Sequence, residues 1–343
     1  MSMFTRLRLA ALVGLSFLVF ASTLSVASEL IDATRAGDAQ RVARLLTDRP
    51  DLNEATGDGM TAAHWAAQSG HVAILQFLLD AGANVDPATR IGSYTPLHIA
   101  SGQANGAIVS LLLQAGADVN ASTTNSNATA LHLAAQAVGG AESVEALLEH
   151  GADVNAKEGA AGQTPLMFAA AKNRVESVEL LLAAGADPSA STIVVEVLKE
   201  VFADRQASRF LQDALSEYEY TNNDKALDSS AVDKVQAAIK AQREFLQSGE
   251  AYQNFSPEAL ITLRPDYPEG PDLPRPPYRE SLVGATGGMT ALLHAAREGH
   301  SESAIALLKG GADVNQVSGA DATSPLLIAA LNGQFDVAML LIE

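Results

Sequence analysis

A short motif returns along this chain at an almost constant interval, and this limits the possible fold more than any other feature. Each copy begins with Thr or Ser followed by Pro or Ala, and then by Leu or Ala. The copies start at Thr61, Thr95, Thr129, Thr164, Thr290 and Ser324. The first four are spaced by 34, 34 and 35 residues, and the last two by 34. Self-similarity at such a period indicates a repeat protein, in which each unit packs only on its neighbours.

Each unit carries the pattern of two short helices. Thr or Ser is a good N-cap, and Pro in the next position suits the first residue of a helix. An Ala-rich turn follows, and then a second apolar run such as IVSLLLQAGADVN at 108–120. Its Leu and Val residues recur at i, i+3 and i+4, which predicts one buried helix face. The Gly after this run is where helices commonly end in a left-handed residue.

The T-P-L-H-x-A-A start and the L-L-x-x-G-A-D-x-N ending resemble the ankyrin repeat. The match recurs six times in register, and 29–58 fits a divergent first repeat. The resemblance implies an all-α solenoid of helix-turn-helix repeats joined by short hairpin fingers. We therefore expect five repeats in 29–189, including an N-terminal cap, and two more in 287–343.

A long insertion separates the two groups of repeats. One hundred residues lie between Ser189 and Thr290, where eight lie between Asn155 and Thr164. Helical patterns at 192–218 and about 230–248 precede a Pro-rich stretch, so 190–286 is predicted to be a helical and Pro-rich insertion. The longer connection adds only about 2 kcal/mol of loop-closure free energy, so the solenoid can resume after it. Two separate sub-arrays are the alternative.

The end of this Pro-rich stretch, LPRPPY at 273–278, suggests two hypotheses. It is either a stiff spacer that returns the chain to the array or a polyproline ligand for another protein.

The N-terminus has the features of a secretory signal. Arg6 and Arg8 precede an apolar run from Leu9 to Ala21, and small residues at 25–28 offer a cleavage site. We expect 1–28 to be a signal peptide of a bacterial protein that is periplasmic or secreted. An uncleaved signal anchored in the inner membrane is the alternative, since 9–27 approaches a minimal span. No other segment reaches that length, so we expect no membrane insertion after cleavage.

The C-terminal residues, DVAMLLIE at 336–343, lie within the second helix of a repeat that lacks its closing Gly-Ala-Asp. Because solenoids need a polar terminal cap, we expect the last repeat to be truncated and the sequence to be a fragment.

Charge and composition narrow the class of partner. The net charge of −18 disfavours binding to nucleic acid and to anionic membranes. The chain has no cysteine, which excludes disulfides, thiolate metal sites and a cysteine nucleophile.

The histidines and aspartates follow the repeat and form no cluster. His64, His98 and His132 occupy the fourth motif position, where the resemblance implies a structural role. The same structural motif includes Thr61, Thr95, Pro96, Thr129, Thr164 and Pro165. With no nucleophile elbow and no phosphate-binding loop, we expect no catalytic site, no metal and no cofactor.

The resemblance implies that the chain binds another protein of unknown identity through the finger tips and the exposed residues around the first helix of each repeat. At matching positions these are Met60, Gln68, Arg90, Tyr94, Gln103, Gln136, Lys172, Met289 and Arg297. Arg90 and Tyr94 are the strongest candidates, because Arg and Tyr often anchor interfaces. We expect a monomeric scaffold in the cell envelope. Two alternatives are an accessory region of an enzyme whose catalytic part lies beyond residue 343, and a host-directed effector.

Overall fold

The computed structural model describes residues 28–219, 229–255 and 285–343. The described chain is almost entirely helical and divides into two units. The first unit contains the repeats, and the second is made of 193–288 together with the short segment 318–323. Residues 1–27, which contain nearly all of the predicted signal, lie outside the described ranges. Within those ranges, no helix is long and apolar enough to cross a bilayer.

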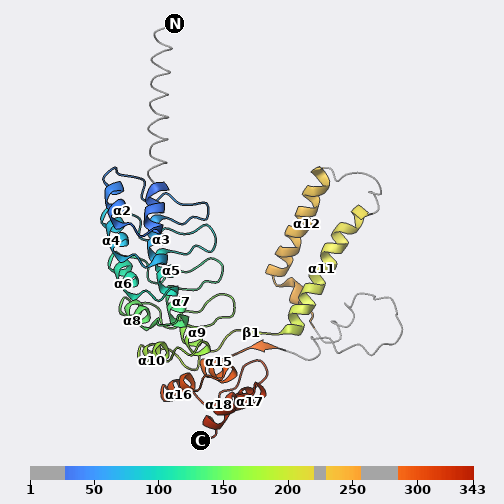
Figure 1. Ribbon diagram of the computed structural model, residues 1–343. Coiled ribbons are helices and arrows are strands. Elements are labelled where there is room, and N and C mark those ends of the chain that lie inside the picture. The colour runs from blue at the N-terminus through green and yellow to red at the C-terminus, as the bar shows by residue number, and fades with distance from the viewer. Residues whose placement is uncertain (1–27, 220–228, 256–284) are drawn as a thin grey trace, which may run out of the picture. The chain divides into compact units, whose positions relative to one another are not determined.

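The first unit is a stack of helix pairs (Figure 1). A helix at 28–35 and α2 (Ala39–Leu46) form the first repeat. Each later repeat pairs an inner helix with an outer one: α3 (Ala62–Ser69) with α4 (Val72–Asp80), α5 (Pro96–Gly102) with α6 (Gly106–Gln114), α7 (Ala130–Gln136) with α8 (Ala141–Glu149), α9 (Pro165–Ala171) with α10 (Val175–Ala183), α15 (Ala291–Glu298) with α16 (Ser301–Lys309), and α17 (Pro325–Leu331) with α18 (Phe335–Leu340). The prediction of a repeat solenoid is confirmed.

The motif sets where each inner helix begins. Thr95 is extended (φ −92°, ψ 166°), and its hydroxyl accepts a hydrogen bond from the main-chain N–H of His98. Pro96 then occupies the first helical turn, where its missing N–H leaves no helical hydrogen bond unmade. In the turn after the outer helix α6, Gly116 has φ 90°, a conformation that side chains with a Cβ rarely adopt.

The core lies between the two helix layers. Inner helices contribute pairs of Ala, such as Ala66 and Ala67, and in most repeats a Leu two residues after the motif Thr, such as Leu131; all three are fully buried. Outer helices contribute side chains such as Leu78 and Leu112, which are equally buried. The small Ala residues let neighbouring inner helices approach closely, while the larger Leu residues fill the space between layers.

The stack continues across the insertion. Helix α9 packs on α15, and α10 packs on α16. Polar contacts join the same repeats: His300 Nε2 lies 3.2 Å from the carbonyl oxygen of Ala171, and the Ser303 hydroxyl donates to Asn173 Oδ1 at 2.8 Å. The alternative of two separate sub-arrays is therefore wrong. The low cost of closing a long connection allows this result, and the buried helix faces stabilise it.

The second unit is a small helical hairpin. Helices α11 (Val197–Glu219) and α12 (Ser229–Gln247) pack together and are followed by a short 3-10 turn, η1 (Glu250–Tyr252). The Phe210 and Phe245 rings stack at 5.2 Å between centroids. Both helices correspond to patterns read from the sequence. The Pro-rich stretch, with both hypotheses for 273–278, lies outside the described residues.

A two-residue ribbon stands at the base of this unit. Strand β1 (Val194–Val195) pairs antiparallel with β2 (Thr286–Gly287), with Val194 opposite Gly287. Gly287 has φ 98°, and a Cβ there would lie 1.9 Å from the carbonyl oxygen of Ile193. Only glycine fits this place, because both the backbone conformation and the close approach exclude a side chain.

The last repeat exposes apolar side chains that earlier repeats bury. Leu326 is 38% exposed, whereas its equivalent Leu292 is 1% exposed. Leu327 is 47% exposed, whereas its equivalent Leu293 is fully buried. In the interior of the stack the next helix pair covers this surface, and among the described residues none follows α18. The expectation of a truncated last repeat stays a prediction.

Candidate functional site

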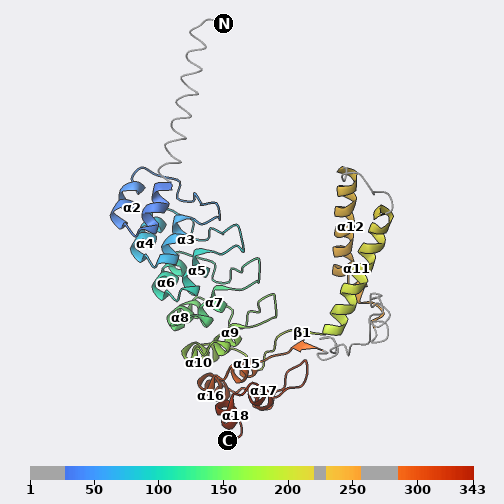
Figure 2. The same cartoon turned by 45° about the vertical axis from the view of Figure 1, so that its right-hand side comes forward.

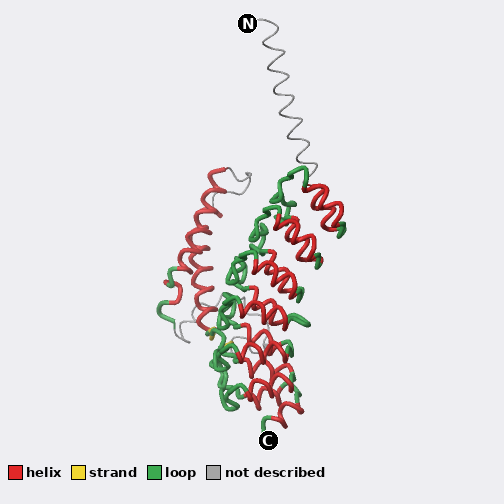
Figure 3. The backbone as a smooth tube through the Cα atoms, turned by 90° about the vertical axis from the view of Figure 1, so that its left-hand side faces the viewer, coloured by secondary structure: helices red, strands yellow, loops and turns green. Residues whose placement is uncertain are grey.

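The loops between repeats gather along one edge of the stack, next to the inner helices (Figures 2 and 3). We call these loops the fingers; the first four precede Thr61, Thr95, Thr129 and Thr164. Main-chain hydrogen bonds join neighbouring finger tips. Arg90 donates to the Asp58 carbonyl oxygen at 2.9 Å, and Thr124 donates to that of Gly92 at 3.0 Å. The fingers therefore form one connected ridge, which fixes the position of their exposed side chains.

An oxygen-bearing side chain holds each of these fingers in shape. The hydroxyl of Thr89 accepts from the main-chain N–H of Tyr94 at 2.9 Å, and Thr123 accepts from Ala128 at 3.1 Å. In the fourth finger the equivalent residue is Glu158, which is 5% exposed and accepts from three main-chain N–H groups at 2.6–3.0 Å. Burial by itself would raise the pKa of this carboxyl, but these hydrogen bonds outweigh it and the net pKa is lowered.

Replacing Glu158 with Ala is expected to destabilise the array by about 2 kcal/mol, because three main-chain N–H groups lose their acceptor. Urea unfolding followed by circular dichroism measures the loss. The control is Glu158→Thr, which places the residue of the neighbouring fingers at the same position and should recover more than half of the lost stability. A Glu158→Ala variant as stable as the wild type would show that the carboxylate does not hold the finger.

Two motif histidines, His64 and His132, each connect one repeat to the next, whereas Nε2 of the third, His98, is buried without a hydrogen-bond partner. Nδ1 of His64 accepts from the main-chain N–H of Thr61 at 3.1 Å, so the proton of the neutral ring lies on Nε2. That Nε2 lies 3.0 Å from the carbonyl oxygen of Tyr94, which precedes the next motif Thr. His132 repeats this arrangement with Thr129 and Gln163, at 3.2 and 3.1 Å. His98 makes the equivalent contact with Thr95 at 3.2 Å.

The buried histidines favour the neutral form. Burial is the main cause that lowers the pKa of His64, His98 and His132 below 6.5, although nearby carbonyl groups partly oppose it. His294, one place after the motif position, is 5% exposed. Burial and the adjacent Arg297 guanidinium lower its pKa to about 4. In the fifth repeat Met167 replaces the motif histidine, and the Thr164 hydroxyl is buried without a hydrogen-bond partner.

The structure places Arg90 and Tyr94 within contacts between fingers. Arg90 Nη1 donates to the Gly57 carbonyl oxygen at 2.9 Å, and Tyr94 Oη accepts from Asn125 Nδ2 at 3.4 Å. Both side chains thus link a finger to its neighbour as well as facing solvent. Ile91, between them at the tip, is 82% exposed and is absent from the predicted set.

The other predicted residues lie on the same side of the stack. Gln68, Gln103 and Gln136 lie at the C-terminal ends of α3, α5 and α7, and Lys172 follows α9; we call these four the amide column. Met60 and Met289 each precede a motif Thr and are half-buried. Arg297 is exposed on α15 and donates to its neighbour Glu298 at 2.9 Å.

The sequence-based prediction missed a second row on the inner helices. Four residues after each motif Thr stand Trp65, Ile99, Leu133 and Phe168, which we call the apolar column. All four are half-buried, and Trp65, Ile99 and Phe168 pack on the core with one side and leave the other exposed. Each stands three or four residues before a member of the amide column, so the two columns share one helix face. The guanidinium of Arg35 lies 4.4 Å from the Trp65 ring centroid, a cation–π contact at the first member.

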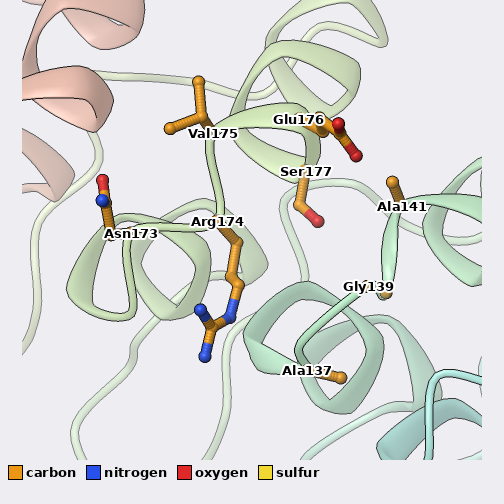
Figure 4. A pocket seen from close by; sticks show the side chains of 9 residues that line it. Ala137, Gly139, Ala141, Asn173, Arg174, Val175, Glu176 and Ser177 are labelled. Atoms are coloured by element: carbon orange, nitrogen blue, oxygen red, sulfur yellow. The ribbon is translucent and has the colours of Figure 1, made fainter.

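A small cavity lies where the turns between inner and outer helices of two neighbouring repeats meet (Figure 4). The turn between α7 and α8 has four residues, against two or three in the other repeats, and it lines a cavity of about 230 Å³ with the start of α10. Arg174 reaches toward this turn and donates from Nε to the Gln136 carbonyl oxygen at 2.9 Å. The cavity is smaller than typical ligand pockets, and Arg174 already has a partner, so it is not a candidate ligand site. Within the described residues, no group of acidic or histidine side chains could hold a metal ion.

Comparison with known proteins agrees with the repeat geometry. A family model described as ankyrin repeats (3 copies) matches residues 30–123, 88–158, 122–192 and 273–343. The human ankyrin repeat domain-containing protein 39 is 42% identical over 53 residues. That stretch covers 16% of this chain and 29% of the human protein.

Proposed function

We propose, because this chain belongs to the ankyrin-repeat family, that it is a non-enzymatic scaffold that binds another protein through the inner helices and fingers. Ankyrin repeats generally mediate contacts between proteins. One observation carries the proposal to this surface: the finger tips are joined by hydrogen bonds into a fixed ridge beside two columns of partly exposed side chains. A surface that is ordered before binding loses less conformational entropy when a partner docks.

The proposal is tested by affinity capture with cross-linking, using the wild type and two variants. Gln103→Arg with Lys172→Glu alters the amide column, and Gln40→Arg with Lys309→Glu makes the same changes on α2 and α16, in the outer layer. A partner recovered with the wild type and the outer variant, but reduced at least tenfold with the inner variant, supports the proposed face. Equal recovery with all three baits would contradict it. These exposed positions are preferable to Arg90 and Tyr94, whose loss would also weaken finger contacts.

We further propose that this scaffold is exported to the envelope of a bacterial cell. The support is the sequence of 1–28, with its two arginines, apolar run and small residues. The test fuses residues 1–40 to alkaline phosphatase, a reporter enzyme that is active only after export. We expect this fusion to give full reporter activity. Replacing Leu12 and Leu15 with Arg should abolish that activity, because charges interrupt the apolar run. An inactive wild-type fusion, with an established signal active in the same cells, would reject export.

A further inference from the structure

The charge of this array is distributed very unevenly between its two helix layers. Helices α3, α5, α7 and α9 carry no Asp, Glu, Lys or Arg along their whole length. The outer helices α8 and α10 alone carry five carboxylates: Glu142, Glu145, Glu149, Glu176 and Glu179. A chain with a net charge of −18 therefore presents four consecutive inner helices without a charged side chain. The surface of the proposed function is therefore much less acidic than the net charge of the chain suggests.

The chemistry of this inner face is apolar and amide. The apolar column offers Trp65, Ile99, Leu133 and Phe168, all half-buried, and the first, second and fourth of these pack on the core behind them. Beside it the amide column offers exposed or half-exposed glutamines on three repeats and the cation Lys172 on the fourth. Amides donate and accept hydrogen bonds without a charge, so they satisfy a partner's main chain as readily as its polar side chains.

We infer that the inner face of α3, α5, α7 and α9 binds an uncharged, mainly apolar segment of a partner protein, and not a basic one. This inference rests on the proposed function and specifies its partner. A Lys or Arg against the inner face would lose hydration without gaining a counter-charge, because no carboxylate belongs to either column. Apolar side chains would instead bury area against the apolar column, at about 25 cal/mol per Å².

The test uses a displayed library of random 16-residue peptides selected on the whole protein. Enriched peptides are synthesised, and their Kd is measured by fluorescence anisotropy. The expected sequences are rich in Leu, Ile, Phe or Trp and depleted in Lys and Arg relative to the library. Their Kd should rise less than about threefold between 0.05 and 0.5 M NaCl, since screening acts on charge pairs and leaves apolar contacts in place.

Two double variants locate the binding face. Gln103→Glu with Gln136→Glu places two carboxylates beside the apolar column, and we expect the Kd to rise at least tenfold. Gln40→Glu with Gln114→Glu adds the same charge on the outer helices α2 and α6, and should leave the Kd within twofold. Both pairs change one side-chain atom at helix positions that are at least partly exposed, and circular dichroism verifies folding.

Several outcomes overturn the inference. Lys- and Arg-rich peptides that bind more tightly after Gln103→Glu with Gln136→Glu would show that the acidic field of the chain dominates. If both double variants weaken peptide binding equally, added net charge and not the inner face determines the Kd. A selection that enriches no sequence would also contradict the inference. None of these outcomes rejects the proposed function, because the capture experiment tests that function separately. If the captured partner is lost with the inner-layer bait but contacts the array through a basic segment, the proposed function stands and this inference is wrong.

Discussion

Lowering the pH from 7 to 4.5 is expected to destabilise the array by several kcal/mol, before most carboxylates become protonated. His64, His98, His132 and His294 all have a pKa below 6.5 in the folded chain. At pH values between the folded and the unfolded pKa of each histidine, the unfolded chain binds more protons than the folded chain. The stability of the array therefore falls as the pH falls below 6.5. For His294, with a pKa of about 4, this difference corresponds to about 3 kcal/mol once the pH is below both values.

The structure gives a reason for this sensitivity. The Nδ1 atoms of the three motif histidines already accept main-chain hydrogen bonds, so a proton added there removes an acceptor and places a charge between repeats. His294 lies beside Arg297, Glu298 and Gln163, and the polar groups nearest its ring are two donors: Gln163 Nε2 lies 3.4 Å from its Nε2, and Arg297 Nη2 lies 3.5 Å from its Nδ1. A second window lies below pH 4.5, where carboxyls with lowered pKa values, such as Glu158, lose their stabilising charge as the pH falls.

His294→Leu isolates one of these contributions, because Leu133 occupies the equivalent place in another repeat. Thermal unfolding is recorded at pH 7 and pH 4.5. Near pH 7 we expect a small effect, while at pH 4.5 the variant should exceed the wild type by about 2 kcal/mol. The control, Leu133→Ile, adds no titrating group, so it should change the stability of the array by the same amount at pH 7 and at pH 4.5. A His294→Leu variant as acid-sensitive as the wild type would reject the assignment.

Much of the fold follows from local patterns that the sequence displays openly. The motif Thr and Pro mark helix starts, and the Leu positions mark the core. The two helices of the insertion, within 192–248, follow from the periodicity of their apolar residues. Whether α15 stacks on α9 does not follow from local patterns. The repeats before and after 190–286 have the same motif, and the closure cost permits either arrangement. The decision depends on faces that only three-dimensional packing brings together.

The candidate site was less predictable, for two physical reasons. Arg90 and Tyr94 have residue types that suit an interface, but their contacts with Gly57 and Asn125 depend on how fingers stack at separations of 33 and 31 residues. The apolar column follows the same helical period as the core, so Trp65 and Phe168 are indistinguishable from core residues by pattern alone. Its register, always four residues after the motif Thr, was the signal that could have identified it.

Leu292→Ala is expected to destabilise the whole array, including repeats far on the other side of the insertion. Leu292 is 1% exposed between α9 and the later helices, and removing such a side chain typically costs 2–5 kcal/mol through lost burial and a cavity. Repeat arrays transmit such a loss only through interfaces between neighbours. Because α9 packs on α15, the loss should reach the second repeat, where the single tryptophan of the chain, Trp65, reports unfolding by its fluorescence.

The measurement compares urea unfolding by Trp65 fluorescence with unfolding by circular dichroism, which reports all helices. In a continuous array both transitions coincide and move together in Leu292→Ala. The matched control is Leu326→Ala at the equivalent position of the last repeat, where 38% exposure predicts a loss below about 1.5 kcal/mol. If Leu292→Ala leaves the fluorescence transition unchanged while the dichroism transition splits, the helices after the insertion unfold on their own. The inner helices of the proposed binding surface would then exclude α15 and α17.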